Sequence, residues 1–246
     1  MKSGMFHLLL SLAVALSTVG VVSAAEKATD SKIDESKAVG LFDAMDQGLV
    51  EVKLIPKNSL QSSLSVTNKT DKEIVVDMPA AFAGVPVVAQ PGGMMGGRGG
   101  MGGMGGRGGM GGGMWSLAPN KTRKESVRTV CLEHGKKEPR STVKYTIVPI
   151  DSYTENKTTQ VLCSMLGDEE IDQNAVQAAV WSTENGLTME ELAAKTKQVS
   201  RNNPVQSYFK GSELELSMQL LEQADARAAE IEEVEKALED LENYKP

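Results

Sequence analysis

The sequence predicts an α+β fold: a small antiparallel immunoglobulin-like β-sandwich with a disordered Gly/Met-rich loop, then a small helical module and a long C-terminal acidic helix. Three observations predict it. Apolar residues alternate with period two from Gly48 onward, and they recur with a period near 3.6 beyond Asp151. In addition, 15 of the 24 glycines in this 246-residue chain fall between Gly92 and Gly113. With 40% hydrophobic and 24% charged residues, the remainder has the composition of a globular protein.

The N-terminal segment has the pattern of a signal peptide. Lys2 supplies a positive charge, residues 8–22 are almost wholly apolar, and small residues precede a cleavage position after Ala24. We therefore expect residues 1–24 to be removed and the protein to be periplasmic or extracellular. We expect no membrane attachment after cleavage, and a disordered leader over residues 25–40, which are polar and charged.

The β-sandwich is predicted over residues 41–155. Val50, Val52 and Leu54 alternate with charged residues, and a polar turn at residues 68–71 precedes a returning apolar strand. Residues 143–148 form a further strand between two prolines. Short strands at this spacing favour an antiparallel sandwich of immunoglobulin type.

The glycine-rich segment, residues 91–114, is predicted to be a disordered loop inserted between two strands. Glycine buries almost no apolar area and loses the most backbone entropy on ordering, so the segment gains little by folding. Thioether sulfur is a soft ligand, so an alternative role for the loop is Cu(I) binding. The methionines available for it are Met94, Met95, Met101, Met104 and Met110.

The helical part is predicted in three pieces. Residues 156–200 form the small helical module, in which Asp172 caps one helix, Gly186 ends it and Thr188 opens a capping box. A linker over 201–211 leads to an acidic helix over 212–246, opened by a second capping box at Ser212.

The acidic helix is the predicted interaction element. From Glu213 to Pro246 the chain has 11 acidic and three basic residues, whereas the net charge of the whole chain is −7. The apolar residues Ile231, Val234, Leu238 and Leu241 keep heptad spacing, but Arg227 interrupts the register. We expect an unidentified protein partner, with this helix as one place where it could bind.

Two cysteines, Cys131 and Cys163, are predicted to form a disulfide, because an even pair in an exported protein usually does. Zinc binding with His134 would leave a fourth ligand missing. The chain has no phosphate-binding loop and no Gly-x-Ser-x-Gly motif. We expect no catalytic residues, no cofactor and no nucleic-acid partner.

Two resemblances add to these expectations. Residues 51–58, 68–71, 80–87, 130–135 and 177–181 resemble uncharacterised exported proteins of planctomycete bacteria, over about Gly48 to Lys195. That group has no established activity to carry over.

The second resemblance is local. Residues 176–181, Val-Gln-Ala-Ala-Val-Trp, resemble the glutamine motif of the thioester domains in bacterial surface adhesins. The resemblance implies that the Cys131 thiolate attacks the Gln177 carboxamide, that ammonia leaves, and that the internal thioester later captures an amine on a partner protein.

Together these features predict a non-enzymatic exported structural or interaction protein. The two alternatives are a covalent surface-adhesion protein with a Cys131–Gln177 thioester and a Cu(I)-binding protein that uses the methionines of the loop. In the structural or interaction protein, Cys131 and Cys163 are bonded to each other, whereas in the adhesion protein Cys131 is bonded to Gln177.

Overall fold

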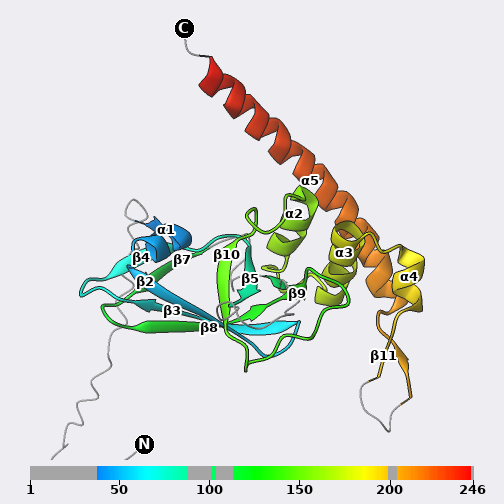
Figure 1. Ribbon diagram of the computed structural model, residues 1–246. Coiled ribbons are helices and arrows are strands. Elements are labelled where there is room, and N and C mark those ends of the chain that lie inside the picture. The colour runs from blue at the N-terminus through cyan, green and yellow to red at the C-terminus, as the bar shows by residue number, and fades with distance from the viewer. Residues whose placement is uncertain (1–37, 88–100, 104–112, 199–203, 245–246) are drawn as a thin grey trace, which may run out of the picture. The chain divides into compact units, whose positions relative to one another are not determined.

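The computed structural model describes residues 38–87, 101–103, 113–198 and 204–244, which belong to one compact unit, Ile33–Pro246 (Figure 1). It combines antiparallel sheets with helices and ends in a long C-terminal helix. The predicted α+β class is therefore confirmed. The immunoglobulin-like connection of the strands stays a prediction.

The larger sheet has seven strands, each antiparallel to its neighbours. In spatial order they are β8 (Thr122–Arg128), β3 (Gln61–Asn68), β2 (Val50–Pro56), β10 (Tyr145–Pro149), β5 (Phe82–Pro86), β6 (Met101–Gly103) and β9 (Val130–Cys131). Strands β2 and β3 form a hairpin, in which Val50 pairs with Asn68 and Pro56 with Ser62. The hairpin predicted across the polar turn at residues 68–71 is wrong, because the strand that returns after that turn, Ile74–Asp77, pairs within the smaller sheet and not with β3. The short strand β9 stands at the far end of this sheet.

A smaller sheet has three strands, β1 (Val39–Gly40), β4 (Ile74–Asp77) and β7 (Met114–Leu117). Strand β1 runs parallel to β4, and β7 runs antiparallel to it. Buried residues of both sheets and of α1 (Leu41–Asp46) form one apolar cluster, which includes Leu64, Val76, Phe82 and Trp115. The inward-facing residues of the period-two pattern thus form the core between the two sheets.

The predicted disordered loop contains one short strand. Residues Met101–Gly103 form β6, which pairs with β5 on one side and β9 on the other. Two neighbouring strands can hydrogen-bond the backbone of a Gly-Gly segment that has no side chains to bury, and composition alone does not anticipate this. The other residues of the loop up to residue 112 lie outside the described part of the chain.

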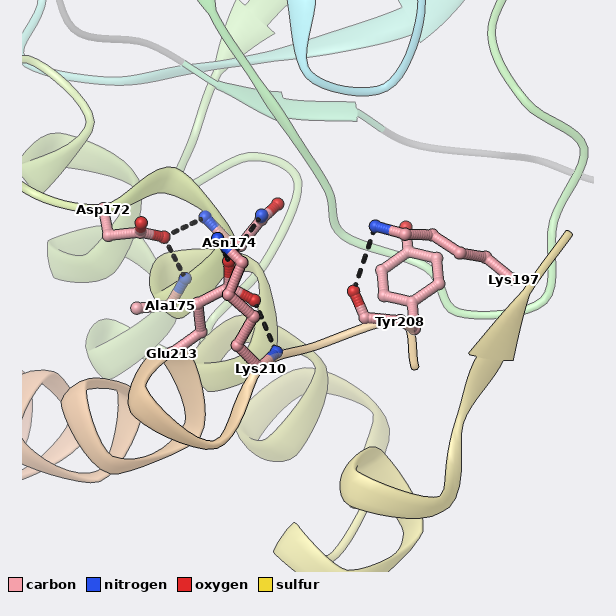
Figure 2. Close-up of polar contacts among 7 residues, drawn as sticks. All are labelled: Asp172, Asn174, Ala175, Lys197, Tyr208, Lys210 and Glu213. Carbon is pink, nitrogen blue, oxygen red and sulfur yellow. Dashed lines mark hydrogen bonds and ion pairs between the residues drawn. The ribbon is translucent and has the colours of Figure 1, made fainter. Parts of the chain in front are cut away.

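The capping pattern predicted for the helical part is confirmed in three places. The Asp172 carboxylate accepts hydrogen bonds from the backbone N–H groups of Asn174 and Ala175 at the start of α3 (Gln173–Asn185) (Figure 2). Gly186 ends α3 with a φ of 70°, in the left-handed region. Thr188 and Glu191 form the capping box of α4 (Met189–Ala194).

The last helix, α5 (Gly211–Asn243), begins one residue before the predicted start. Ser212 is not its N-cap. Glu213 is buried and accepts a hydrogen bond from the Lys210 N–H at 2.7 Å and another from the Asn174 side chain at 3.1 Å (Figure 2). Glu213 thus makes the local capping contact at Lys210 and also joins α5 to α3.

Helices and strands share a second core. Buried residues of α2 (Lys157–Met165), α3 and α5 pack with Ala83 of β5 and Val130 of β9. The helical module is therefore built on the end of the larger sheet, which satisfies the requirement that such short helices pack on other elements. A two-stranded ribbon of β11 (Thr196–Lys197) and β12 (Gln206–Ser207) joins α4 to α5.

The predicted signal peptide and most of the predicted leader lie outside the described residues. Among the residues that are described, no helix has the length and apolar character needed to cross a bilayer.

Candidate functional site

The most specific contact between the sheet and the helices joins Gln177 to Cys131. Gln177 is on α3, with only 1% of its surface exposed, and Cys131 is the last residue of β9. The Cys131 backbone N–H donates to Oε1 of Gln177 at 2.7 Å, and Nε2 of Gln177 donates to the Cys131 carbonyl at 2.9 Å. The carboxamide thus lies across the main chain of one residue and is bonded at both ends.

This contact follows from the position of β9 at the end of the sheet. On its other side β9 pairs with β6, where Cys131 is opposite Met101. In an extended strand the N–H and C=O of one residue point to the same side, so the outer side of Cys131 presents a donor and an acceptor together. A buried carboxamide has one acceptor and one donor group in matching positions, and it satisfies both.

The Cys131 thiol lies in a half-buried environment that disfavours its charged form. Burial is the largest cause that raises its pKa, to about 12, and the Glu138 carboxylate raises it further. A hydrogen bond with the Ser59 side chain acts in the opposite direction. The thiol is therefore protonated at neutral pH, and Ser59 is the neighbour that favours the thiolate.

Ser59 is itself held in position by two contacts. Its backbone N–H donates to the Glu138 carboxylate at 2.7 Å, and its carbonyl accepts from the Thr129 hydroxyl at 2.8 Å. Both partners flank Cys131 in sequence, so the loop before β3 is fastened to the segment around β9. The main chain of Ser59 is thereby held against the segment around β9.

Aromatic and basic side chains cover the helix side of the site. Trp181 follows Gln177 by one turn of α3 and packs with Phe209, and Cys131 contacts the same apolar cluster. Tyr208 lies 5.4 Å from the Trp181 ring, and burial is the main cause that raises its pKa to about 12. The surroundings of Cys131 and Gln177 are thus mainly apolar, in which fixed dipoles act more strongly than in water.

A lysine and a histidine lie next to this cluster. Nζ of Lys195 is 2.6 Å from Nε2 of His134 and 5.2 Å from the centre of the Trp181 ring. Burial, and then the Lys195 charge, lowers the pKa of His134, so the imidazole is neutral and accepts from the ammonium group. His134 is thus engaged with Lys195, and its ring meets that of Trp181 edge-on at 4.9 Å.

The predicted disulfide is wrong in this structure. Cys131 and Cys163 are both described, and both thiols are free. Cys163 is fully buried in α2, within the core that α2, α3 and α5 share, whereas Cys131 packs against the Trp181 cluster. The two side chains belong to different clusters, and this separation is the physical reason that they are not paired.

The structure does not test the predicted methionine ligands. In the part of the chain that is described, no group of three His, Cys, Asp or Glu side chains could hold a metal ion. Of the loop methionines, Met94, Met95, Met104 and Met110 lie outside the described residues, and only the backbone of Met101 is described, in β6. Cu(I) binding stays a prediction.

Sequence reasoning thus named Cys131 and Gln177 but missed Ser59, Glu138 and Tyr208. These residues come from three separate segments and match no motif spacing. Ser59 and Glu138 occur in polar loops, where their side chains have no apolar pattern to reveal them. No sequence signal could have joined them to the site, because the contacts depend on the packing of the loops around β9.

The chain was compared with family models, with curated proteins and with solved structures, and none of these matches it. Its function is therefore argued from the site alone.

Proposed function

We propose that this protein forms an internal thioester between Cys131 and Gln177 and uses it to attach covalently to an amine on a partner molecule. The observation that carries the proposal is the pair of hydrogen bonds between the Gln177 carboxamide and the Cys131 main chain, at 2.7 and 2.9 Å. They bring the acyl group to the residue that carries the nucleophile. The free thiol of Cys131 also supports the proposal, because a disulfide would occupy the same sulfur.

The hydrogen bonds suit the chemistry of thioester formation. A nucleophile attacks a carboxamide carbon from one face of the amide plane, and in a strand the side chain projects to one side of the plane that contains the N–H and C=O groups. A carboxamide bonded across these groups therefore turns one face toward the side chain of the same residue. Thioester formation requires Sγ of Cys131 to reach Cδ of Gln177 from that face.

The step balances as an acyl transfer. A bond forms between Sγ of Cys131 and Cδ of Gln177, the Cδ–Nε2 bond breaks, and the thiol proton leaves on nitrogen as part of ammonia. Negative charge develops on Oε1 during the attack, where the Cys131 N–H already donates a hydrogen bond. A fixed backbone donor at that oxygen stabilises the tetrahedral intermediate, as in an oxyanion hole.

Ser59 is the positioning residue in this proposal. Because burial raises the pKa of the thiol to about 12, thioester formation needs a neighbour that favours the thiolate, and the Ser59 side chain is hydrogen-bonded to it. Ser59→Ala should leave the final product unchanged but slow its formation. The pH at which formation reaches half its maximal rate should rise, a change that a purely structural role for Ser59 would not produce.

The thioester would then react once with an amine. The amine nitrogen bonds to Cδ, the bond to sulfur breaks, and the Cys131 thiol is released. A single capture event is not catalysis, so the protein remains a non-enzymatic adhesion or structural protein, as the sequence suggests. Export, predicted from the first 24 residues, would place the amine-bearing partner outside the cytoplasm.

Intact mass spectrometry of the full purified chain tests the proposal. We expect a mass lower than the sequence mass by one ammonia, and a gain of one methylamine after incubation with that amine. Cys131→Ala and Gln177→Ala should each have the full mass of their own sequence. Cys163→Ala, the matched control, should still be lighter than its sequence mass by one ammonia.

Two outcomes would overturn the proposal. A chain at its full sequence mass, with two thiols that react with a thiol reagent after unfolding, would show that no thioester forms. A loss of two hydrogens that a reducing agent restores would show a disulfide in its place. Peptide mapping of a chain that has lost ammonia must locate the cross-link at Cys131 and Gln177.

A further inference from the structure

One face of the helix α5 is covered for only part of its length. Up to Ala228 this face packs on α2 and α3: Ser217, Leu220, Ala224 and Ala228 are all buried. Beyond it, α5 continues past α2 toward the C-terminal end (Figure 1). Thr158 of α2 bonds to Asp225, and Lys157 forms an ion pair with Glu235 at 2.7 Å. These contacts mark where α2 and α5 part.

The apolar residues continue where the cover ends. Ile231, Val234, Leu238 and Leu241 are 41%, 59%, 55% and 70% exposed. Their spacing of three and four residues places them on one side of the helix, and we call these four residues the α5 seam. A helix that extends from the body with an exposed apolar stripe gains stability when a partner covers the stripe.

A groove leads into the α5 seam. It has a volume of about 520 Å³ and lies beside α2 and α5, with Val161, Met165 and Ile171 among its apolar residues and Ile231 at one side. Ile231 thus belongs to both the groove and the seam. Asp168, Arg227 and Glu230 also line the groove, so two of its three charged residues are acidic.

The charges beside the seam indicate what can cover it. With Ile231 and Leu238 at the first position of a heptad and Val234 and Leu241 at the fourth, the flanking positions are Glu230, Glu235, Ala237 and Glu242. Every charged residue among these four is a glutamate. A second copy of α5, parallel or antiparallel, would place glutamates opposite glutamates, whereas a basic helix would place lysines or arginines there.

We propose that the α5 seam and its groove form the docking site for a basic amphipathic helix of another protein. The partner helix carries apolar residues at heptad spacing, flanked by lysine or arginine. It buries the α5 seam and pairs with Glu230 and Glu242. This site is independent of the Cys131–Gln177 chemistry, and it would recruit a partner without a covalent bond.

Two labelled synthetic helical peptides test the proposal on the full chain. Both have leucines at heptad spacing, one with lysine at every flanking position and the other with glutamate. Fluorescence anisotropy should show binding of the lysine peptide that weakens with added salt, and affinity for the glutamate peptide should be lower by on the order of tenfold or more.

Variants locate the binding site. Val234→Glu/Leu238→Glu should abolish binding of the lysine peptide without changing the melting temperature, because both residues are exposed. Met218→Glu is the matched control, since Met218 is 50% exposed on the same helix but on a different side. Binding should survive in that variant.

Three results would overturn the proposal: equal binding of the two peptides, no binding of the lysine peptide, or lysine-peptide binding that the double variant retains. A neutral-pH dimer that the Val234→Glu/Leu238→Glu variant dissociates would also contradict it, because the seam would then be occupied by a second copy. Sedimentation velocity distinguishes that case.

Discussion

The two cysteine thiols of this protein have similarly raised pKa values, but different groups surround them. Burial is the main cause that raises the pKa of both thiols to about 12. Cys163 lies within an apolar core and is wholly buried, whereas Cys131 is beside a buried carboxamide and a serine hydroxyl. Burial makes a thiol unreactive in general, so a specific reaction of one of two buried thiols depends on an acyl group placed beside it.

The largest expected effect comes from removing the carboxamide beside Cys131. In a Cys131→Ala background, which cannot form the thioester, Gln177→Leu should lower the free energy of unfolding by about 2–4 kcal/mol. The reason is that the N–H and C=O groups of residue 131 both lose their partner in a part-buried position. Urea denaturation of the two variants measures the difference, and a loss below about 1 kcal/mol would contradict this role of Gln177.

Gln177→Glu in the same background sharpens this test. A protonated glutamic acid can accept from the N–H and donate to the C=O of residue 131, but a carboxylate cannot donate. Burial raises the pKa of such a group above its unfolded value of about 4.3, so its stabilising contribution is present below that pH and is lost as the pH rises. A stability profile that is flat between about pH 4 and pH 8 would contradict the expectation.

An intermediate effect is expected at alkaline pH from Cys163. Its pKa is near 12 in the folded protein and about 8.5 when unfolded, so the folded state binds more protons between these values. The contribution of Cys163 to the free energy of unfolding is fully present below about pH 8.5 and is lost as the pH rises above that value. At about pH 9.5 the loss amounts to about 1.4 kcal/mol. The profile of Cys131→Ala, minus that of Cys131→Ala/Cys163→Ala, isolates this contribution, and identical profiles would refute it.

The smallest effect compares serine with alanine at each cysteine. At position 163 a hydroxyl enters an apolar core, so Cys163→Ser should be less stable than Cys163→Ala by about 1 kcal/mol. At position 131 the Ser59 side chain can bond to the new hydroxyl, so Cys131→Ser should be at least as stable as Cys131→Ala. Chemical denaturation of the four variants gives the difference in free energy of unfolding between serine and alanine at each position. If that difference were the same at positions 131 and 163, the two cysteines would not differ in their polar surroundings.

Much of the local structure could be predicted from the sequence. Period-two alternation located the strands β2, β3 and β4, and short-range hydrogen-bonding preferences located the ends of α3 and the capping box of α4. The alternation did not reveal that β3 pairs with β2 and that β4 belongs to the smaller sheet, because strand partners depend on tertiary packing. The disulfide could not be judged in this way, because pairing depends on whether two side chains meet in space. The start of α5 was misplaced by one residue. The contact between Glu213 and Asn174 of α3 is one that no local pattern reveals.

The sequence alone was enough for the α+β class, the caps of α3 and α4, the acidic character of α5 and the two residues of the thioester hypothesis, because each depends on composition, period or a short motif. Only the packing of distant segments places Gln177 against Cys131, fastens Ser59 to the segment around β9, and covers one face of α5 as far as Ala228. The physical reason is that these contacts join segments distant in the chain. Their free energy depends on packing, which no single segment contains.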